Sequence, residues 1–154
     1  RKAADGGTSF LPFGNYYAYY LNGKTDHESD TSVTFSVRNS VENNRVSFIL
    51  GANALEGFVP GDSNAKYDRI DVEFYNQLLN IYYVKSGVRT LAKSFVSNLK
   101  YNSENVLKYR LENTGKNTFV KLILNDAEYS TAIAAKVCGD RFGFYSYKNT
   151  VIIY

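Results

Sequence analysis

Residues 69–75 read RIDVEFY, a segment in which polar and apolar side chains alternate at every position. Ile70, Val72 and Phe74 fall on one face of an extended chain, and the polar side chains fall on the other. Period-two alternation of this kind is typical of a strand with one buried face. Six later segments follow a similar pattern: LLNIYYV (78–84), RTLAKSFV (89–96), NVLKYRL (105–111), TFVKLIL (118–124), DRFGFYSY (140–147) and TVIIY (150–154).

The residues before this series predict three more strands, and short polar turns separate most of the segments. Ser86-Gly87, residues 114–117 and Asn125-Asp126 are predicted hairpin turns. Many short strands in one chain of 154 residues predict an all-β fold, a sandwich of two antiparallel sheets forming one domain over residues 1–154. The three earlier strands are NYYAYYLN (15–22), TSVTFSVR (31–38) and RVSFILG (45–51).

The apolar members of each alternation are the predicted core between the two sheets, because each sheet must bury its apolar face. Residues 1–14 are predicted to form an N-terminal arm, and residues 52–67 a long loop of the kind that often binds ligands. Residues 127–140 fit either a strand or one or two helical turns. The predicted core comprises Phe35, Val37, Phe48, Leu50, Ile70, Val72, Phe74, Ile81, Leu107, Leu111, Leu122 and Leu124.

Composition and charge argue against several classes of function. The net charge is +3 and the basic residues form no run, which gives nucleic-acid binding little support. No apolar stretch approaches the roughly 20 residues of a membrane-spanning helix, so we expect no membrane insertion. The only cysteine, Cys138, is predicted to be a small buried side chain, and the only histidine, His27, to lie in a polar loop. A Ser-His or Cys-His catalytic arrangement is therefore poorly supported.

The order of segments resembles the concanavalin A-like lectin and glucanase superfamily, which includes laminin-G-like modules and carbohydrate-binding modules. The resemblance runs through VTFSVR (33–38), VSFILGA (46–52), LLNIYYVKSGVRTLAKS (78–94), residues 106–126 and residues 142–154. It implies a jelly-roll β-sandwich with one concave sheet, and glycan binding on that sheet or along one edge.

The same resemblance implies a structural calcium ion in many members of the superfamily. We expect no other cofactor, and the sequence contains no DxDxDG run that would hold calcium in a single loop. The acidic residues that the early part of the chain offers are dispersed: Asp5, Asp26, Glu28, Asp30 and Asp62.

Residues 67–76, YDRIDVEFYN, resemble the active-site strand of sandwich-fold glycoside hydrolases of the xyloglucanase and laminarinase type. In that motif a glutamate nucleophile, an assisting aspartate and a glutamate acid/base occupy alternate positions on one strand face. Asp71 and Glu73 match the second and third positions, but Arg69 stands where the nucleophile should be. An arginine side chain stays protonated and cannot attack an anomeric carbon. We therefore expect a hydrolase remnant or a chance similarity, and no catalysis.

The polar face of this strand still suits sugar recognition, because carboxylates and guanidinium groups bond to hydroxyls and tyrosine rings stack on pyranoses. The alternative is a solvated ladder of cross-strand ion pairs. The predicted glycan site lies on the wet face of one sheet, beside the 52–67 loop. Its residues are Asp71, Glu73, Tyr75, Tyr82 and Arg110.

We therefore expect a non-catalytic glycan-binding module, located outside the cell, on the cell surface or in a virion, and forming part of a larger protein or assembly. A protein-binding or structural sandwich domain, of the kind used in adhesion and virion assembly, is the second hypothesis. A sandwich-fold glycoside hydrolase is the third. Binding to a glycan array would distinguish the first hypothesis from the second.

Overall fold

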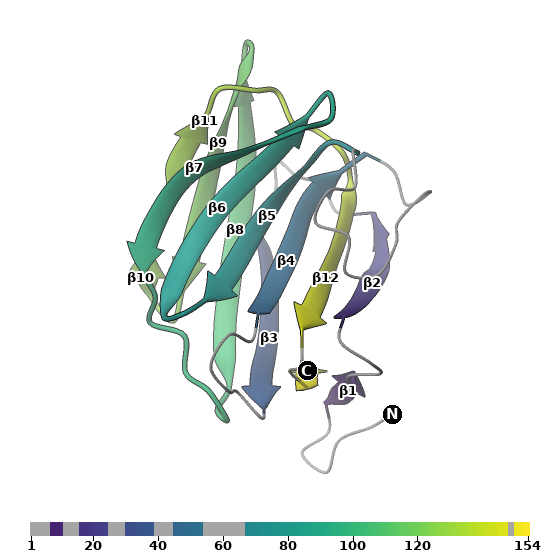
Figure 1. Ribbon diagram of the computed structural model, residues 1–154, viewed down its shortest axis with the longest axis vertical. Coiled ribbons are helices and arrows are strands. Elements are labelled where there is room, and N and C mark those ends of the chain that lie inside the picture. The colour runs from purple at the N-terminus through teal and green to yellow at the C-terminus, as the bar shows by residue number, and fades with distance from the viewer. Residues whose placement is uncertain (1–6, 11–15, 25–29, 39–44, 54–66, 148–149) are drawn as a thin grey trace.

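The computed structural model describes residues 7–10, 16–24, 30–38, 45–53, 67–147 and 150–154. Within these ranges the chain forms strands and no helix (Figure 1). The strands are β1 (Thr8–Phe10), β2 (Tyr16–Lys24), β3 (Thr31–Arg38), β4 (Arg45–Ala52), β5 (Arg69–Tyr75), β6 (Leu78–Lys85), β7 (Val88–Val96), β8 (Asn105–Thr114), β9 (Asn117–Leu124), β10 (Ala127–Glu128), β11 (Thr131–Ile133), β12 (Arg141–Tyr147) and β13 (Thr150–Ile153).

The strands build two stacked antiparallel sheets, which confirms the predicted sandwich. One sheet has six strands in the order β2-β12-β4-β5-β6-β7, and these strands lie side by side in Figure 1. The other has the order β1-β13-β3-β8-β9-β10, with β11 also paired to β9. Neighbours such as β12 and β4, or β13 and β3, are far apart in sequence, so both sheets depend on long-range pairing.

Two-residue turns connect neighbouring strands into hairpins within each sheet. Ser86 and Gly87, with φ of 51° and 82°, connect β6 to β7, and Asn125 and Asp126, at 50° and 66°, connect β9 to β10. Left-handed backbone at both central positions matches the right-handed twist of the flanking strands. These turns and the one within residues 114–117 were predicted from the sequence, and all three are confirmed.

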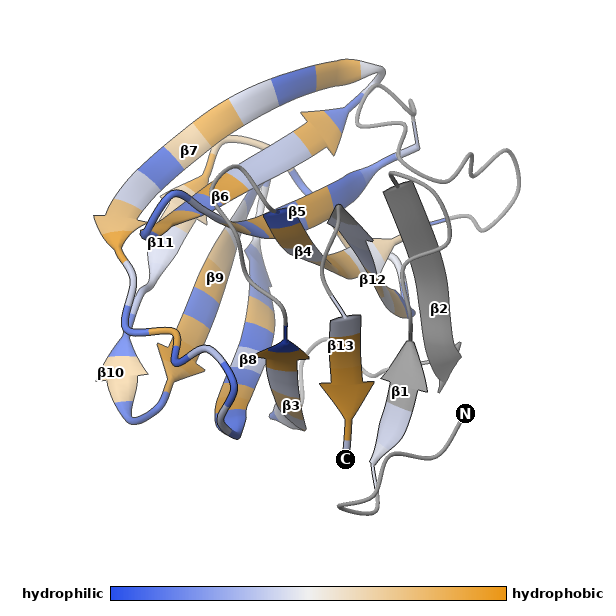
Figure 2. Cartoon of the chain, turned by 60° about the horizontal axis from the view of Figure 1, so that its bottom comes forward, coloured by the Kyte–Doolittle hydropathy of each residue, from blue (hydrophilic) through white to orange (hydrophobic). Residues whose placement is uncertain are grey.

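The core lies between the two sheets and contains all twelve predicted residues, each buried. In Figure 2, hydrophobic and hydrophilic positions alternate along β8 and β9, as one buried face per sheet requires. Aromatic rings form the centre of this core. The ring centroids of Phe35 and Phe48 are 4.7 Å apart, and the rings of Tyr109 and Phe142 stack at 5.5 Å.

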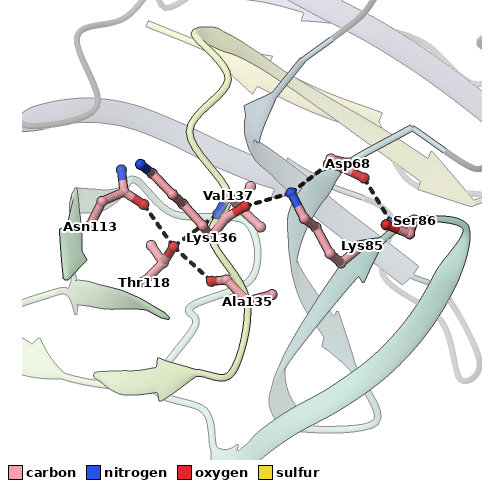
Figure 3. A network of polar contacts seen from close by, with 8 residues as sticks. All are labelled: Asp68, Lys85, Ser86, Asn113, Thr118, Ala135, Lys136 and Val137. Carbon is pink, nitrogen blue, oxygen red and sulfur yellow. Dashed lines mark hydrogen bonds and ion pairs between the residues drawn. The ribbon is translucent and has the colours of Figure 1, made fainter. Parts of the chain in front are cut away.

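Residues 135–137 connect the two sheets through polar contacts (Figure 3). The Thr118 hydroxyl on β9 donates to the carbonyl of Ala135 and accepts from the amide of Val137, both at 2.9 Å. On the other sheet, Lys85 donates to the carbonyl of Lys136 at 2.9 Å and to Asp68 at 3.0 Å. The segment is thereby fixed to both layers.

Residues 127–140 are extended, with the short strands β10 and β11 and no helical turn. Cys138 is exposed, so the prediction of a buried thiol is wrong. The reason is local alternation, since Val137 enters the core and its neighbour must point outward. Most of the predicted arm (1–14), most of the predicted loop (52–67) and His27 lie outside the described residues.

Candidate functional site

Polar side chains from neighbouring strands line up on the outer face of the six-stranded sheet. Glu73 on β5 pairs with Ser47 on β4 and with Asn80 on β6, and Tyr145 on β12 is the other neighbour of Ser47. Since directly opposed residues share a sheet face, these side chains form one row across four strands. We call this surface the polar face, and define it as Ser47, Arg69, Asp71, Glu73, Asn80, Tyr82, Arg89, Ser94 and Tyr145.

A buried ion pair anchors the polar face. The Arg69 Nε atom lies 2.9 Å from Asp71 Oδ1, and the two residues are 1% and 0% exposed. A second guanidinium, that of Arg89, reaches the same carboxylate, with its Nε atom 3.5 Å from Asp71 Oδ2. Its Nη2 atom lies 3.7 Å from Glu73 Oε2. Two arginines therefore face two carboxylates on the outer side of the sheet.

Arg89 is the member of this cluster that reaches solvent. Its guanidinium stacks over the Tyr82 ring at 3.6 Å from the centroid, and a quarter of its side chain is exposed. Its contacts to Asp71 and Glu73 are ion pairs, and its Nε and Nη2 atoms make no hydrogen bond within the described part of the chain. Arg89 is thus held by stacking and charge more than by directed bonds.

A chain of hydrogen bonds extends from Glu73 to the edge strand. Asn80 Nδ2 donates to Glu73 Oε1 at 3.3 Å, and Ser94 on β7 donates to Asn80 Oδ1 at 2.6 Å. Because Ser94 donates its proton to Asn80, the orientation of the Asn80 amide is determined. The polar face therefore presents carboxylate, amide and hydroxyl groups in defined positions.

Burial shifts the pKa of two residues of the polar face, Asp71 and Tyr145. Burial raises the pKa of Asp71 above its usual range, although the charges of Arg69 and Arg89 oppose the shift. Burial, together with the negative charge of Asp71, raises the pKa of Tyr145 to about 12. The Tyr145 hydroxyl therefore stays neutral across the physiological range and remains available as a donor.

The raised pKa of Tyr145 predicts a loss of stability in alkali. The folded state holds the phenol proton more tightly than the unfolded state, so this stabilisation is complete below about pH 10 and is lost as the pH rises toward 12. Two pKa units correspond to about 2–3 kcal/mol. Urea unfolding of the wild type and of Tyr145→Phe, from about pH 9 to pH 12, should show the wild type losing that much more. Parallel pH profiles for the two proteins would contradict the assignment.

Comparison with known proteins identifies the architecture. No protein-family model matches the sequence, and a search of curated proteins finds no match. Among solved structures, the metal-free carbohydrate recognition domain of Emp46p matches with a TM-score of 0.73 and 13% identity, over 99% of this chain and 84% of that one. A Lotus tetragonolobus seed lectin matches at 0.63 and 14%, over 100% and 86%. The exoplasmic domain of VIP36, bound to Ca²⁺ and Man3GlcNAc, matches at 0.62 and 10%, over 96% and 78%.

The chain has the concanavalin A-like lectin fold. The jelly-roll sandwich implied by the sequence resemblance is therefore confirmed. At these identities the likeness establishes the fold alone. In the lectin fold of this chain, the polar face occupies the outer side of the six-stranded sheet, and the aromatic core occupies its inner side.

The prediction that Asp71 and Glu73 lie on a wet face is wrong, because they are 0% and 6% exposed. The alternative of a solvated ion-pair ladder is wrong for the same reason. Alternation correctly places both carboxylates opposite the core, but it cannot show what covers them. In this lectin fold, Arg69 on the same strand and Arg89 on β7 lie against the carboxylate of Asp71, and the amide of Asn80 on β6 lies against that of Glu73.

The lectin fold brings four of the five predicted site residues onto one face. Tyr82 is the direct partner of Asp71, and Tyr75 lies one row beyond Glu73 on the same strand, under the guanidinium of Arg45 at 4.3 Å. Arg110 lies on β8, in the other sheet, so the prediction that it extends this patch is wrong. Side-chain alternation alone does not assign a strand to a sheet.

Sequence reasoning missed Arg89 and Tyr145. The signal for Arg89 was present, since a two-residue turn at Ser86-Gly87 sets Arg89 opposite Val84. Val84 is in turn the partner of Arg69, so the three residues form one row across the sheet. No local signal identifies Tyr145, because β12 joins β4 through a pairing between segments nearly a hundred residues apart.

The described residues do not fit the calcium site that the sequence resemblance implies. No group of three His, Cys, Asp or Glu side chains gathers among them. Asp71 and Glu73 face two guanidinium groups, which would repel a divalent cation. Asp30 faces Arg110 at 4.0 Å. Asp5, Asp26, Glu28 and Asp62 lie outside the described residues.

Proposed function

We propose that this domain is a non-catalytic glycan-binding module, and that the polar face of the six-stranded sheet holds the sugar. The observation that carries the proposal is the Arg89–Tyr82 stack, which stands at the solvent boundary over two carboxylates. A flat ring beside groups that both donate and accept hydrogen bonds suits a pyranose, which has one apolar face and a rim of hydroxyls. The lectin fold adds support, since structural neighbours are named as lectins or a carbohydrate recognition domain.

The residues of the polar face take different roles in this proposal. Tyr82 and Arg89 contact the sugar because their side chains reach solvent, and Glu73 accepts from a hydroxyl at the edge of the buried cluster. Asp71 is fully buried and instead positions Arg89. Tyr75, capped by Arg45, extends the surface by one row. Arg110 is left out of this site.

We expect binding by a single module to be weak, with a dissociation constant of about 10 µM to 1 mM, because a shallow site desolvates many hydroxyl groups. A glycan array identifies the sugar, and isothermal titration then measures its affinity. Replacing Tyr82 with alanine should weaken binding about tenfold, since it removes the stacking surface and the support for Arg89.

Tyr101→Ala is the matched control for this change. Tyr101 is 36% exposed and lies outside the polar face, so its removal should leave the affinity unchanged. Far-ultraviolet circular dichroism and thermal melting verify that both variants stay folded. Full affinity in a folded Tyr82→Ala variant would show that the sugar binds elsewhere.

We propose that the module does not hydrolyse glycosidic bonds. Arg69 occupies the position of the nucleophile in the resembled motif, and its side chain is bonded to Asp71 at 2.9 Å. A permanently charged guanidinium supplies neither a nucleophile nor a proton acceptor. Laminarin, xyloglucan and lichenan incubated with the protein should release no reducing ends above a buffer control.

A protein-binding or structural role is the second candidate, and the edge strand β7 favours it. Val88, Leu91 and Val96 on this strand are 64%, 48% and 78% exposed, and Leu78 on β6 is 36% exposed. Exposed apolar side chains on a sheet edge are typical of surfaces that pair with another chain. A protein that binds no sugar on the array and self-associates in sedimentation analysis would support this role.

We also propose that the module works outside the cell, on a cell surface or in a virion, as part of a larger protein or assembly whose partner is a glycan. We propose neither nucleic-acid binding nor insertion into a membrane. Within the described ranges, the structure contains no helix long and apolar enough to cross a membrane.

A further inference from the structure

A shallow trough crosses β8 and β9 on the outer face of the seven-stranded sheet. It consists of two hollows, with volumes of about 90 and 270 Å³, that share Lys108 and Ile123. Arg110, Lys121 and Asp30 line one hollow, and Lys100, Val106 and Asp126 help to line the other. We call this surface the basic trough. The core of the sandwich separates it from the polar face.

The positively charged side chains of the basic trough lie close enough to repel one another. Arg110 and Lys121 are direct cross-strand partners, and Lys108 lies two residues from Arg110 on the same face of β8. Like charges placed directly opposite each other destabilise a sheet. Asp30 and Glu112 compensate only Arg110, at 4.0 and 3.5 Å. Among the described residues, neither Lys108 nor Lys121 forms an ion pair, so a bound anion would relieve the repulsion.

The shape of the basic trough indicates an extended ligand. Lys100 continues the line of positive charge beyond Lys108, and successive same-face residues on a strand stand about 6.5–7 Å apart. Val106 and Ile123 are half-buried between the cations and form an apolar floor. The hollows are too small and open to enclose a compact ligand, since such pockets usually measure about 300–1,000 Å³.

We propose that the basic trough is a second binding site, for a linear polysaccharide that carries sulfate or carboxylate groups. Lys108, Lys121 and Arg110 bond to the anionic groups, while the apolar floor contacts the sugar rings. Single-stranded nucleic acid fits less well, because it needs exposed aromatic rings for base stacking, and Tyr109, the aromatic residue lining the trough, is only 2% exposed. This site does not depend on sugar binding at the polar face.

The test uses the full chain and four immobilised polymers: heparin, polygalacturonate, neutral dextran and single-stranded oligo(dT). The wild type should bind heparin or polygalacturonate and not dextran, and the polymer preferred identifies sulfate or carboxylate as the group recognised. Affinity should fall on the order of tenfold as NaCl rises from about 50 to 300 mM, because salt screens exposed charges. Absence of binding to both polysaccharides, or equally tight binding of oligo(dT), would overturn the proposal.

A charge-matched pair of double variants tests the location. Lys108→Gln/Lys121→Gln should weaken polyanion binding at least tenfold, because two charged contacts are lost. Lys116→Gln/Lys136→Gln removes the same charge from two exposed positions outside the trough and should change affinity less than twofold. Equal losses in the two variants would mean that net charge alone is responsible, which overturns the site. Tyr82→Ala should retain full polyanion binding, so failure of the polar-face proposal and failure of this one are distinguishable.

Discussion

Replacing Asp71 with alanine is expected to lower the free energy of unfolding by about 3–5 kcal/mol. The change leaves the Arg69 guanidinium, in a residue 1% exposed, without the carboxylate that lies 2.9 Å away. Removing one partner of a buried ion pair is strongly destabilising because an uncompensated charge remains in a poorly solvated site. Urea unfolding followed by circular dichroism measures the loss.

Two further variants separate this explanation from a general effect of mutation. In Arg69→Leu/Asp71→Leu both charges of the buried pair are gone, while Arg89 is a quarter exposed and keeps its contact with Glu73. The cost should therefore fall to about 1 kcal/mol or less, since apolar pairs often replace buried ion pairs without penalty. Glu112→Ala breaks the exposed pair with Arg110, whose side chains are 41% and 47% exposed, and should also cost under about 1 kcal/mol. A cost for Asp71→Ala no larger than that for Glu112→Ala would disprove the account.

Asp71→Ala is consequently a poor probe of sugar binding. The sequence alone predicted that this carboxylate lies on the wet face of a sheet. The structure instead places this carboxylate under Arg89, where its loss would disturb both stability and the position of Arg89. Tyr82→Ala is the better probe, because Tyr82 is only half-buried.

Replacing Phe48 with alanine should destabilise the domain by about 3–5 kcal/mol. Phe48 is 0% exposed, and its ring centroid lies 4.7 Å from that of Phe35 and 5.9 Å from that of Phe142. It also neighbours Phe74 and Phe144, at 6.3 and 6.2 Å. Truncation would remove contacts with both sheets and leave a cavity that rings fixed on three other strands cannot fill. Chemical unfolding gives the loss directly.

Phe119→Ala is the matched control for the Phe48 variant. Phe119 is half-buried on β9 and points away from the core, so the same truncation should cost about 1 kcal/mol. If the two variants lose equal stability, the aromatic cluster around Phe48 is not the centre of the core.

The sequence pattern was sufficient to predict the positions of the strands and the residues of the core. β3 and β5 have the predicted bounds, and all twelve predicted core residues are buried. The reason is that each strand must satisfy one local condition, an apolar face every second residue, whichever strand becomes its neighbour. Hairpin turns could be predicted equally well, because residues such as Asn125 and Asp126 tolerate the left-handed backbone that the turn needs.

The candidate site could be predicted only in part. Asp71, Glu73 and Tyr75 share a face because they alternate on one strand, and Tyr82 joins them through a short hairpin. The same argument could have predicted Arg89, since the turn at Ser86-Gly87 sets its register. It could not have predicted Tyr145, because nothing near Tyr145 in the sequence specifies the pairing of β12 with β4.

The sequence by itself determined which side chains of each strand face the same way, since alternation is a property of a single extended segment. The tertiary structure alone decided which strands share a sheet, and so placed Arg110 on the face opposite Asp71. It also decided that Asp71 is buried, because its partner Arg69 on the same strand is joined there by Arg89 from β7. Burial and strand order both arise from contacts between distant segments, and a local sequence pattern does not predict those contacts.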